Sequence, residues 1–210
     1  MIVYGRLSRY CLLLVIIFEL TCINLILTAP ILCFGKQALK KTNMINKEFL
    51  IDQWTKEIKA TATSFRTVPD AKANYKPSEK TRSASELVSH MLGEINDMNS
   101  IIDNGSIDHV PAVITTMEEA AKTYEAKATE FLDKLTKVDE NTWTTKIIPM
   151  IYQGNKVYEA PMAAMVWVNF KDMIHHRGQL STYFRPMGAK NPSIYGPTAE
   201  MMEEMAAQKN

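Results

Sequence analysis

The chain has 210 residues, of which 46% are hydrophobic and 22% charged, which is enough for one well-buried core and short for two. Residues 1–43 carry five basic side chains and one acidic one, a net of +4, so with +1 for the whole chain the remainder carries −3. A mildly acidic body without basic clusters argues against nucleic acid as a partner. The 13 methionines of the whole chain and its low aromatic content of 9%, beside many Ala, Leu, Lys and Glu residues, favour an all-α fold.

The cysteines are confined to the N-terminal segment, at Cys11, Cys22 and Cys33. The rest of the chain therefore has no disulfide framework and no thiolate for metal binding or catalysis, which fits a reducing compartment. We expect a cytoplasmic protein, the alternative being one anchored to a membrane through residues 11–34.

Residues 11–34 are apolar enough and long enough to cross a bilayer, although Glu19 and Pro30 interrupt them. They make a poor cleavable signal peptide, because Leu27 occupies the minus-three place of a cut after Ala29 and Pro30 follows the cut directly. Two interpretations stay open, an uncleaved membrane anchor and an upstream extension that is not part of the working protein.

We favour the upstream extension, because the composition changes at Met44 from apolar and cysteine-bearing to charged and cysteine-free. The expected organisation is a hydrophobic N-terminal extension over residues 1–43 and one helical bundle over residues 44–210.

The first three helical patterns of the body lie between residues 46 and 137. The first, residues 46 to about 66, repeats apolar residues at helical spacing with Lys and Glu between them. Ser83 followed by Glu86 supplies an N-cap with a carboxylate three residues on, and opens a second helix that runs to about Asp103. The third helix spans roughly residues 116 to 137.

The last part of the body begins with a different pattern. Residues 142–159 mix β-branched and aromatic residues around Gln153-Gly154-Asn155, which predicts a small hairpin or an irregular crossover. A fourth helix runs from near Pro161 to about Arg185, where Pro186 ends it. Together the elements predict an all-α, antiparallel four-helix bundle with a long crossover before the last helix.

The fourth predicted helix carries the residues with the most chemical information. Asp172 and His176, four residues apart, share one helix face and can converge on one ion. His175 competes, but its neighbours on the helix surface are more polar, so we expect His176 to point inward. His90 lies at the margin of the apolar stripe of the second helix, and Gly93 leaves room beside it.

Two imidazoles and one carboxylate form a ligand set that suits Zn²⁺, Ni²⁺, Mn²⁺ or Fe²⁺ with positions open to water or substrate. By themselves these signals are weak, because a single histidine is more often an ordinary core or surface residue, and an Asp and a His four apart are commonly an ion pair. His109, in a loop beside Pro111, we interpret as a surface residue.

The run His175-His176-Arg177-Gly178-Gln179-Leu180, its continuation to Gly188, and the following run Pro192 to Pro197 resemble the DinB/YfiT-like metal-binding bundles. Upstream, Tyr75-Lys76-Pro77, Arg82 and the run Glu86 to His90 look like the approach to that family's first metal ligand. The resemblance covers about Met44 to Pro197.

This resemblance implies a four-helix bundle, often a homodimer, that holds a divalent metal with one His of the second helix and a four-spaced pair of the last. Carried over residue by residue, the ligands are His90, Asp172 and His176. The family usually has His where this chain has Asp172. An oxygen donor there shifts metal preference away from Zn²⁺ and leaves the identity of the metal open.

The resemblance also implies an activity, because some relatives are S-transferases that couple a small thiol to an electrophilic molecule, and a metal ion lowers the pKa of a thiol. Metal-dependent hydrolysis is the second hypothesis. Its candidate general base is Glu94, although a solvated helix carboxylate is the simpler interpretation of that residue. A non-catalytic, stress-response module braced by its metal ranks third.

The position of the working N-terminus can be tested directly. N-terminal sequencing of the native protein is expected to begin at Met44, because the amphipathic pattern starts there. A native chain that begins at Met1 and sediments with membranes would instead support the anchor.

Overall fold

The computed structural model describes residues 46–208, which are mostly helical with a small three-stranded sheet. The apolar stretch at residues 11–34 lies outside these residues, and none of the described helices is long and apolar enough to cross a membrane. The helices are α2 (Lys47–Thr67), the short 3₁₀ helix η1 (Asp70–Lys72), α3 (Ala84–Asp103), α4 (Met117–Thr136), α5 (Glu140–Thr145), α6 (Met162–Ser181) and α7 (Ala199–Ala207). The strands are β1 (Ile107–Asp108), β2 (Ile147–Tyr152) and β3 (Asn155–Pro161).

The long helices begin where polar side chains can satisfy their free N–H groups. Asn46 accepts from the backbone N–H of Phe49 at the start of α2, and Thr116 accepts from Glu119 at the start of α4. Ser83 and Glu86 form the complete capping box that the sequence predicts for α3. These local bonds place the helix starts within a residue or two of the predicted positions.

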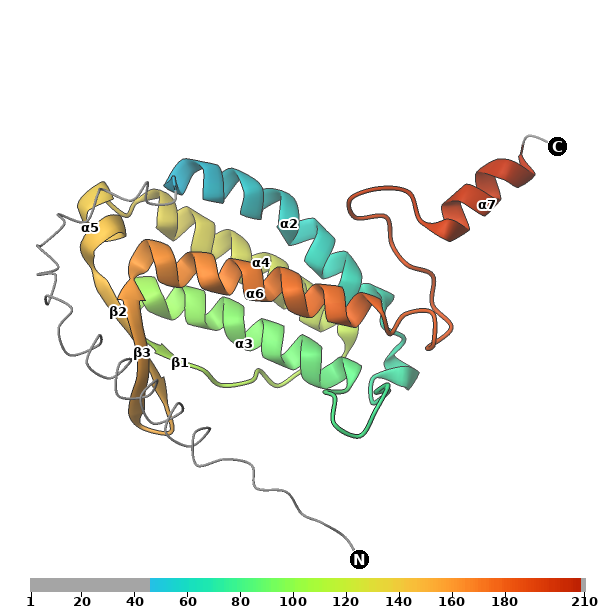
Figure 1. The fold of residues 1–210 in the computed structure, drawn as a ribbon, viewed down its shortest axis with the longest axis horizontal. Coiled ribbons are helices and arrows are strands. Elements are labelled where there is room, and N and C mark those ends of the chain that lie inside the picture. The colour runs from blue at the N-terminus through green and yellow to red at the C-terminus, as the bar shows by residue number, and fades with distance from the viewer. Residues whose placement is uncertain (1–45, 209–210) are drawn as a thin grey trace, which may run out of the picture. The chain divides into compact units, whose positions relative to one another are not determined.

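The four long helices α2, α4, α3 and α6 form the bundle, in which α2 and α3 each pack against both α4 and α6 (Figure 1). Its core is built around Trp54, whose ring lies 4.9 Å from that of Phe131 on α4 and 5.1 Å from that of Phe170 on α6. Trp54 and Phe131 are completely buried. Burial of these rings supplies much of the apolar surface that stabilises the bundle.

The directions of the helices differ from the predicted simple antiparallel bundle. Lys47 at the start of α2 contacts Val138 beyond the end of α4, so these two helices are antiparallel. Tyr183, after α6, donates to the carbonyl of Arg82 before α3 at 3.1 Å, so α3 and α6 are antiparallel too. In contrast, α3 and α4 run in the same direction (Figure 1).

A long crossover is therefore also needed between α3 and α4, and residues 107–116 provide it by running back along the bundle (Figure 1). Its first part, β1, pairs in parallel with β2, with Ile107 opposite Met150. The prediction of a hairpin before the last helix is confirmed, since β2 and β3 are antiparallel and meet at Gln153-Gly154. The sheet means that the fold is not purely α-helical.

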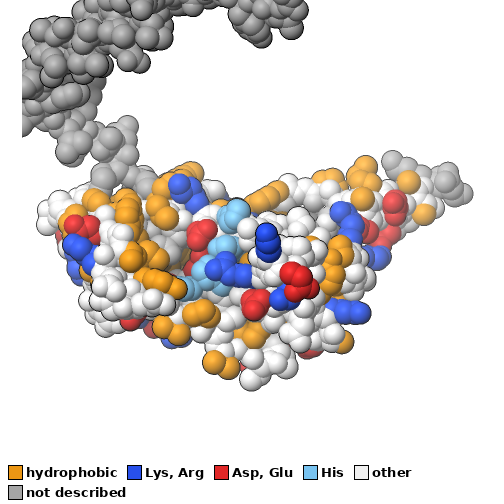
Figure 2. Space-filling view, turned by 60° about the horizontal axis from the view of Figure 1, so that its bottom comes forward, with side chains coloured by type: hydrophobic (Ala, Val, Ile, Leu, Met, Phe, Trp, Pro, Cys, Tyr) orange, Lys and Arg blue, Asp and Glu red, His pale blue; other side chains and the backbone are white. Residues whose placement is uncertain are grey.

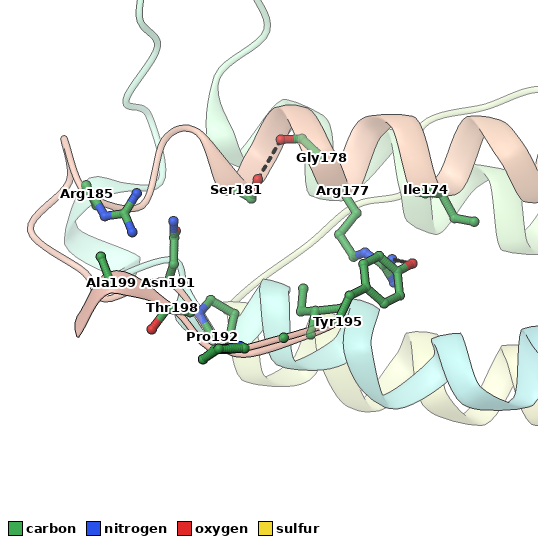
Figure 3. Close-up of a pocket in the computed structure, with 13 residues that line it drawn as sticks. Ile174, Arg177, Gly178, Ser181, Arg185, Asn191, Pro192, Tyr195, Thr198 and Ala199 are labelled. Carbon is green, nitrogen blue, oxygen red and sulfur yellow. Dashed lines mark hydrogen bonds between the residues drawn. The ribbon is translucent and has the colours of Figure 1, made fainter. Parts of the chain in front are cut away.

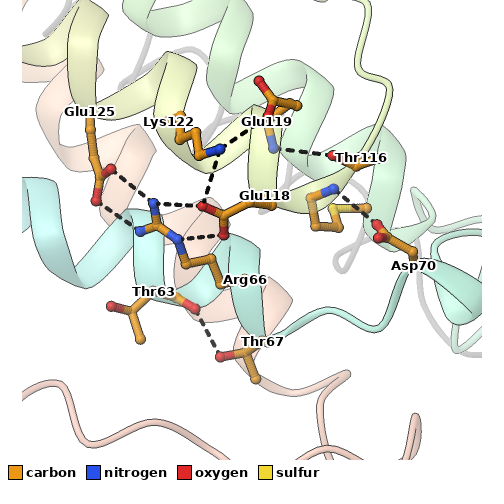
Figure 4. A network of polar contacts seen from close by, with 10 residues as sticks. Thr63, Arg66, Thr67, Asp70, Thr116, Glu118, Glu119, Lys122 and Glu125 are labelled. Carbon is orange, nitrogen blue, oxygen red and sulfur yellow. Dashed lines mark hydrogen bonds and ion pairs between the residues drawn. The ribbon is translucent and has the colours of Figure 1, made fainter.

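Ion pairs on the surface join the end of α2 to the start of α4 (Figure 4). Arg66 donates from Nε to Glu118 and from Nη1 to Glu125, both at 2.8 Å. The hydrogen bond from Arg66 lowers the pKa of Glu125. Nearby, Asp70 accepts from the backbone N–H of Met117 at 2.9 Å. This network fixes the end of the bundle where the crossover enters α4.

The crossover approaches α3 closely at Gly93. A Cβ atom on Gly93 would lie 2.7 Å from the carbonyl oxygen of Val110 and 2.8 Å from Cε1 of His109. One turn earlier, Ser89 accepts from the backbone N–H of Ala112 at 3.0 Å, and its hydroxyl donates to the carbonyl of the same residue. The absence of a side chain at Gly93 therefore lets the crossover lie directly on the helix.

We predict that Gly93→Ala lowers the free energy of unfolding by about 1–3 kcal/mol, because the added methyl group overlaps backbone of the crossover. Gly178→Ala is the matched control, since it is also helical and its Cβ would meet nothing within 4 Å. That variant is expected to gain about 0.5–1 kcal/mol from helix propensity. Urea unfolding followed by circular dichroism measures both, and equal effects would contradict the close approach.

Candidate metal centre

Two helices bring four metal-ligating side chains together in one cluster. His90 and Glu94 lie one turn apart on α3, and Asp172 and His176 lie one turn apart on the facing side of α6. Each offers one ligand atom, and the four atoms all lie within 4.8 Å of one another. Figure 2 shows histidine side chains reaching the surface as a group bordered by acidic and basic side chains.

The ring nitrogens and the carboxylates face one another across the two helices. His90 Nε2 lies 3.1 Å from His176 Nε2 and 3.5 Å from Glu94 Oε1. His176 Nε2 lies 3.5 Å from Asp172 Oδ2. The described donor atoms thus converge on one small volume, as the ligands of a single ion do.

Burial is uneven across the cluster. Glu94 is 3% exposed and His176 7%, whereas the Asp172 side chain is 49% exposed. His176 points inward as expected and its neighbour His175 is exposed. Although Asp172 shares a helix face with His176, it lies at the rim of the cluster, where α6 faces solvent. The cluster is therefore closed toward the core and open on the Asp172 side.

The electrostatic state of Glu94 is unusual for a carboxylate. Burial, reinforced by the neighbouring Asp172 carboxylate, raises the pKa of Glu94 to about 10. Its Oε2 atom is buried and has no hydrogen-bond partner among the described residues. The sequence-based interpretation of Glu94 as a solvated helix carboxylate is therefore wrong, and no local pattern could reveal this, since its burial comes from α6.

The other three groups are shifted in directions that follow from their surroundings. The hydrogen bond with His176 holds the pKa of Asp172 well below its ordinary value. Burial, together with the charge of Arg82, lowers the pKa of His90 to about 4. Burial also disfavours charge on His176, but its hydrogen bonds with Asp172 and Gln179 outweigh this and raise its pKa.

Both histidines of the cluster form a hydrogen bond through Nδ1 with a residue outside the cluster. His176 Nδ1 lies 2.9 Å from Gln179 Oε1, which accepts the ring proton. His90 Nδ1 lies 2.8 Å from Nε2 of His109, whose own Nδ1 is 2.6 Å from Asp97. The interpretation of His109 as a surface residue is therefore wrong, since the crossover places its ring against α3 and leaves the side chain only 16% exposed.

Arg177, which follows His176, lies on a different side of α6, away from the cluster. Its guanidinium contacts Glu57 and the hydroxyl of Tyr195, and donates to Thr61 Oγ1 at 3.2 Å. Figure 3 shows Arg177 and Tyr195 together at one end of a hollow between α6 and residues 191–199, whose volume is about 490 Å³. Arg177 is 3% exposed, so this part of the motif ties the C-terminal segment to the bundle.

A second hollow, of about 600 Å³, adjoins the cluster. Gln179, the partner of His176, lines it together with Lys80 and Arg82 from the segment before α3. Neither basic side chain has an ion-pair partner within residues 46–208. A small molecule in this hollow would lie beside the cluster and face two positive charges.

The fold and the site define a helical bundle with a candidate metal centre between α3 and α6. The sequence model of the DinB family matches residues 43–209, and the chain belongs to that family. The uncharacterized protein YjoA of Bacillus subtilis (strain 168) is 31% identical over 128 residues, which are 58% of this chain and 78% of YjoA.

Solved structures share the fold. The crystal structure of the DinB-like YjoA superposes with a TM-score of 0.56 at 23% identity, and covers 71% of this chain and 99% of that chain. A DinB-like protein from Bacillus cereus ATCC 10987 gives a TM-score of 0.57 at 20% identity, and covers 70% of this chain and 97% of its own.

We predict that the metal-free protein loses stability as pH rises from about 7 to 9. Unfolded Glu94 ionises near its ordinary pKa of 4.5, whereas folded Glu94 keeps its proton up to about 10, so the folded state binds more protons in between. Below pH 6.5 the lowered pKa of His90 has the opposite effect, which leaves the higher range for the test.

Glu94→Gln is expected to remove most of this slope, which cannot exceed about 1.4 kcal/mol per pH unit for one proton. Chemical unfolding in the presence of a chelator, at several pH values, measures it for both proteins. Identical slopes for wild type and variant would show that Glu94 is ionised in the fold.

Proposed function

We propose that His90, Asp172 and His176, with Glu94, hold one divalent metal ion, and that the protein is a metal-dependent S-transferase that couples a small thiol to an electrophilic molecule. The observation that carries the proposal is the convergence of four donor atoms within 4.8 Å. Family membership supports the same site.

The chemistry of the donor set fits a cation. Two carboxylates and two imidazoles surround one volume, and the buried Glu94 Oε2 lacks any partner among the described side chains. A buried acceptor without a donor costs roughly 1–3 kcal/mol, and a bound cation would remove that cost. Two oxygen donors beside two nitrogens suit Mn²⁺ and Fe²⁺ better than an all-nitrogen set would, and Zn²⁺ and Ni²⁺ are also compatible.

A bound divalent ion would lower the pKa of a thiol that reaches the site. The protein's own residues then have three tasks. The buried Glu94 and His176, with the partly buried His90, keep bulk water from the inner side, while the exposed Asp172 marks the side from which a substrate enters. Lys80 and Arg82 line the adjoining hollow and favour a substrate with an anionic group.

The distribution of cysteines supports a thiol that comes from solution. All three cysteines precede residue 34, so the bundle itself offers no thiolate. A transferase of this type needs none, because its nucleophile is a substrate.

Hydrolysis is the second candidate, and the position of Glu94 favours it. A general base must be ionised and within hydrogen-bond reach of the water it activates. A bound cation would lower the pKa of Glu94, the buried carboxylate of the cluster, which lies 3.5 Å from His90. A thiol transferase does not require this carboxylate as a base. Glu94→Gln is therefore expected to abolish hydrolysis while it only weakens thiol transfer.

The ligand assignment can be tested by elemental analysis after dialysis against Mn²⁺ or Zn²⁺. We expect one bound equivalent in the wild type and its loss in His176→Ala, because the inward imidazole is removed. The matched control is His175→Ala, whose exposed ring contacts Gln179 and not the cluster, and which should keep the ion. Retention by His176→Ala with loss by His175→Ala would overturn the assignment.

The reaction can be tested with the metal-loaded protein, an electrophile and each of several cellular thiols. Mass spectrometry should detect a thiol conjugate whose formation depends on both the ion and His176. If no thiol yields a conjugate, but an ester or amide is cleaved and Glu94→Gln abolishes the cleavage, the hydrolase takes the place of the transferase.

A further inference from the structure

A line of three side chains leads from the core of α3 to the metal cluster. Asp97 Oδ2 lies 2.6 Å from His109 Nδ1, and His109 Nε2 lies 2.8 Å from His90 Nδ1. The opposite nitrogen of His90, Nε2, faces His176. All three side chains are largely buried, at 7%, 16% and 15% exposed for Asp97, His109 and His90.

With Asp97 ionised and His109 neutral, the donor and acceptor capacities of these groups determine where each proton lies. An ionised carboxylate can only accept, so His109 must carry a proton on Nδ1 to bond with Asp97. Neutral His109 then has a free lone pair on Nε2, which can accept only from a protonated Nδ1 of His90. His90 is left with its lone pair on Nε2, and this atom points into the cluster.

We propose that His109, held by Asp97, is a positioning residue that fixes the tautomer and the ring orientation of His90 for metal binding. The proposal rests on the function proposed above, because it assigns a purpose to His109 only if His90 is a ligand. A ligating imidazole needs its second nitrogen held by an outer partner, and that partner sets which nitrogen carries the lone pair.

The backbone is arranged to bring His109 to this place. Gly93, one turn after His90, leaves the space that Cε1 of His109 occupies. The bonds between Ser89 and Ala112 hold the crossover on the other side of the histidine. The His90 and His109 rings meet edge to face, with centroids 4.6 Å apart and planes at 78°. A loop histidine packed only for burial would not need contacts on both sides.

The second histidine of the cluster offers an independent comparison. His176 is also held through Nδ1, by Gln179 on its own helix, which likewise leaves Nε2 toward the cluster. On α3 the same three-residue spacing from His90 leads to Gly93, which has no side chain to act as such a partner. His109 of the crossover therefore has for His90 the role that Gln179, on the same helix, has for His176.

The test uses the full-length, metal-free protein, so that it does not depend on any metal-driven activity. Long-range ¹H–¹⁵N NMR of the imidazoles at neutral pH is expected to show His90 protonated on Nδ1 and unprotonated on Nε2. In His109→Phe the Nδ1–H group of His90 loses its acceptor, and His90 should shift toward the Nε2-protonated tautomer. The same His90 tautomer in both proteins would overturn the proposal.

Metal affinity provides the second readout, with Zn²⁺ alone as the probe in competition with a chromogenic chelator. His109→Phe is expected to weaken binding by roughly 10–100-fold, as loss of an outer partner does. His109→Gln should restore most of the affinity, because its amide oxygen can accept from His90 Nδ1. Asp108→Asn, at the exposed neighbour of His109, is the control and should bind as the wild type does.

The outcomes separate this inference from the proposed function. If the wild type binds neither Zn²⁺ here nor Mn²⁺ in the elemental analysis, the metal site fails, while the NMR result still decides whether His109 sets the His90 tautomer. If the wild type binds Zn²⁺ and His109→Phe and His109→Gln lose affinity equally, the positioning role is wrong and the metal site stands. Should His109→Phe not fold, Asp97→Ala serves instead, since it frees His109 to change tautomer.

Discussion

The close approach of α3 to α6 is the constraint on which the site depends. Each helix contributes two polar side chains one turn apart, and their meeting places Glu94 at 3% exposure among two imidazoles and another carboxylate. Burying such groups costs free energy that the apolar core around Trp54 must offset. Burial raises the pKa of Glu94, and a cation in the cluster would stabilise its ionised form.

The crossover between α3 and α4 gives the bundle a feature that an up-and-down connection would lack. Because α3 and α4 are parallel, the chain must travel the length of the bundle between them, and it does so along α3. This route carries His109 to the back of His90 and pairs β1 with β2. The unusual connection and the environment of the candidate ligand therefore have one origin.

The run His175 to Leu180, which resembles the DinB family, places side chains on two sides of α6. His176 and Gln179 face the cluster, where the amide holds the ring. Arg177 faces another side of α6 and binds Glu57 and Tyr195, which lies in the segment after α6. A substitution at Arg177 should thus affect attachment of the C-terminal segment, whereas one at His176 should affect the candidate metal site. Adjacent positions in the sequence have separate purposes because successive residues of a helix point about 100° apart.

The sequence by itself determined the helices and one side of the site. Capping residues such as Ser83 and Glu86 act within one turn, so α3 begins at the predicted residue. The spacing of Asp172 and His176 is local too, and His90 was a candidate from its place at the margin of an apolar stripe, which the family resemblance supported. Helix direction, the burial of Glu94 and the contact of His109 with His90 were decided only by the tertiary structure. Periodicity shows which face of a helix is apolar, but it does not show which distant segment will cover a polar residue at the edge of that face.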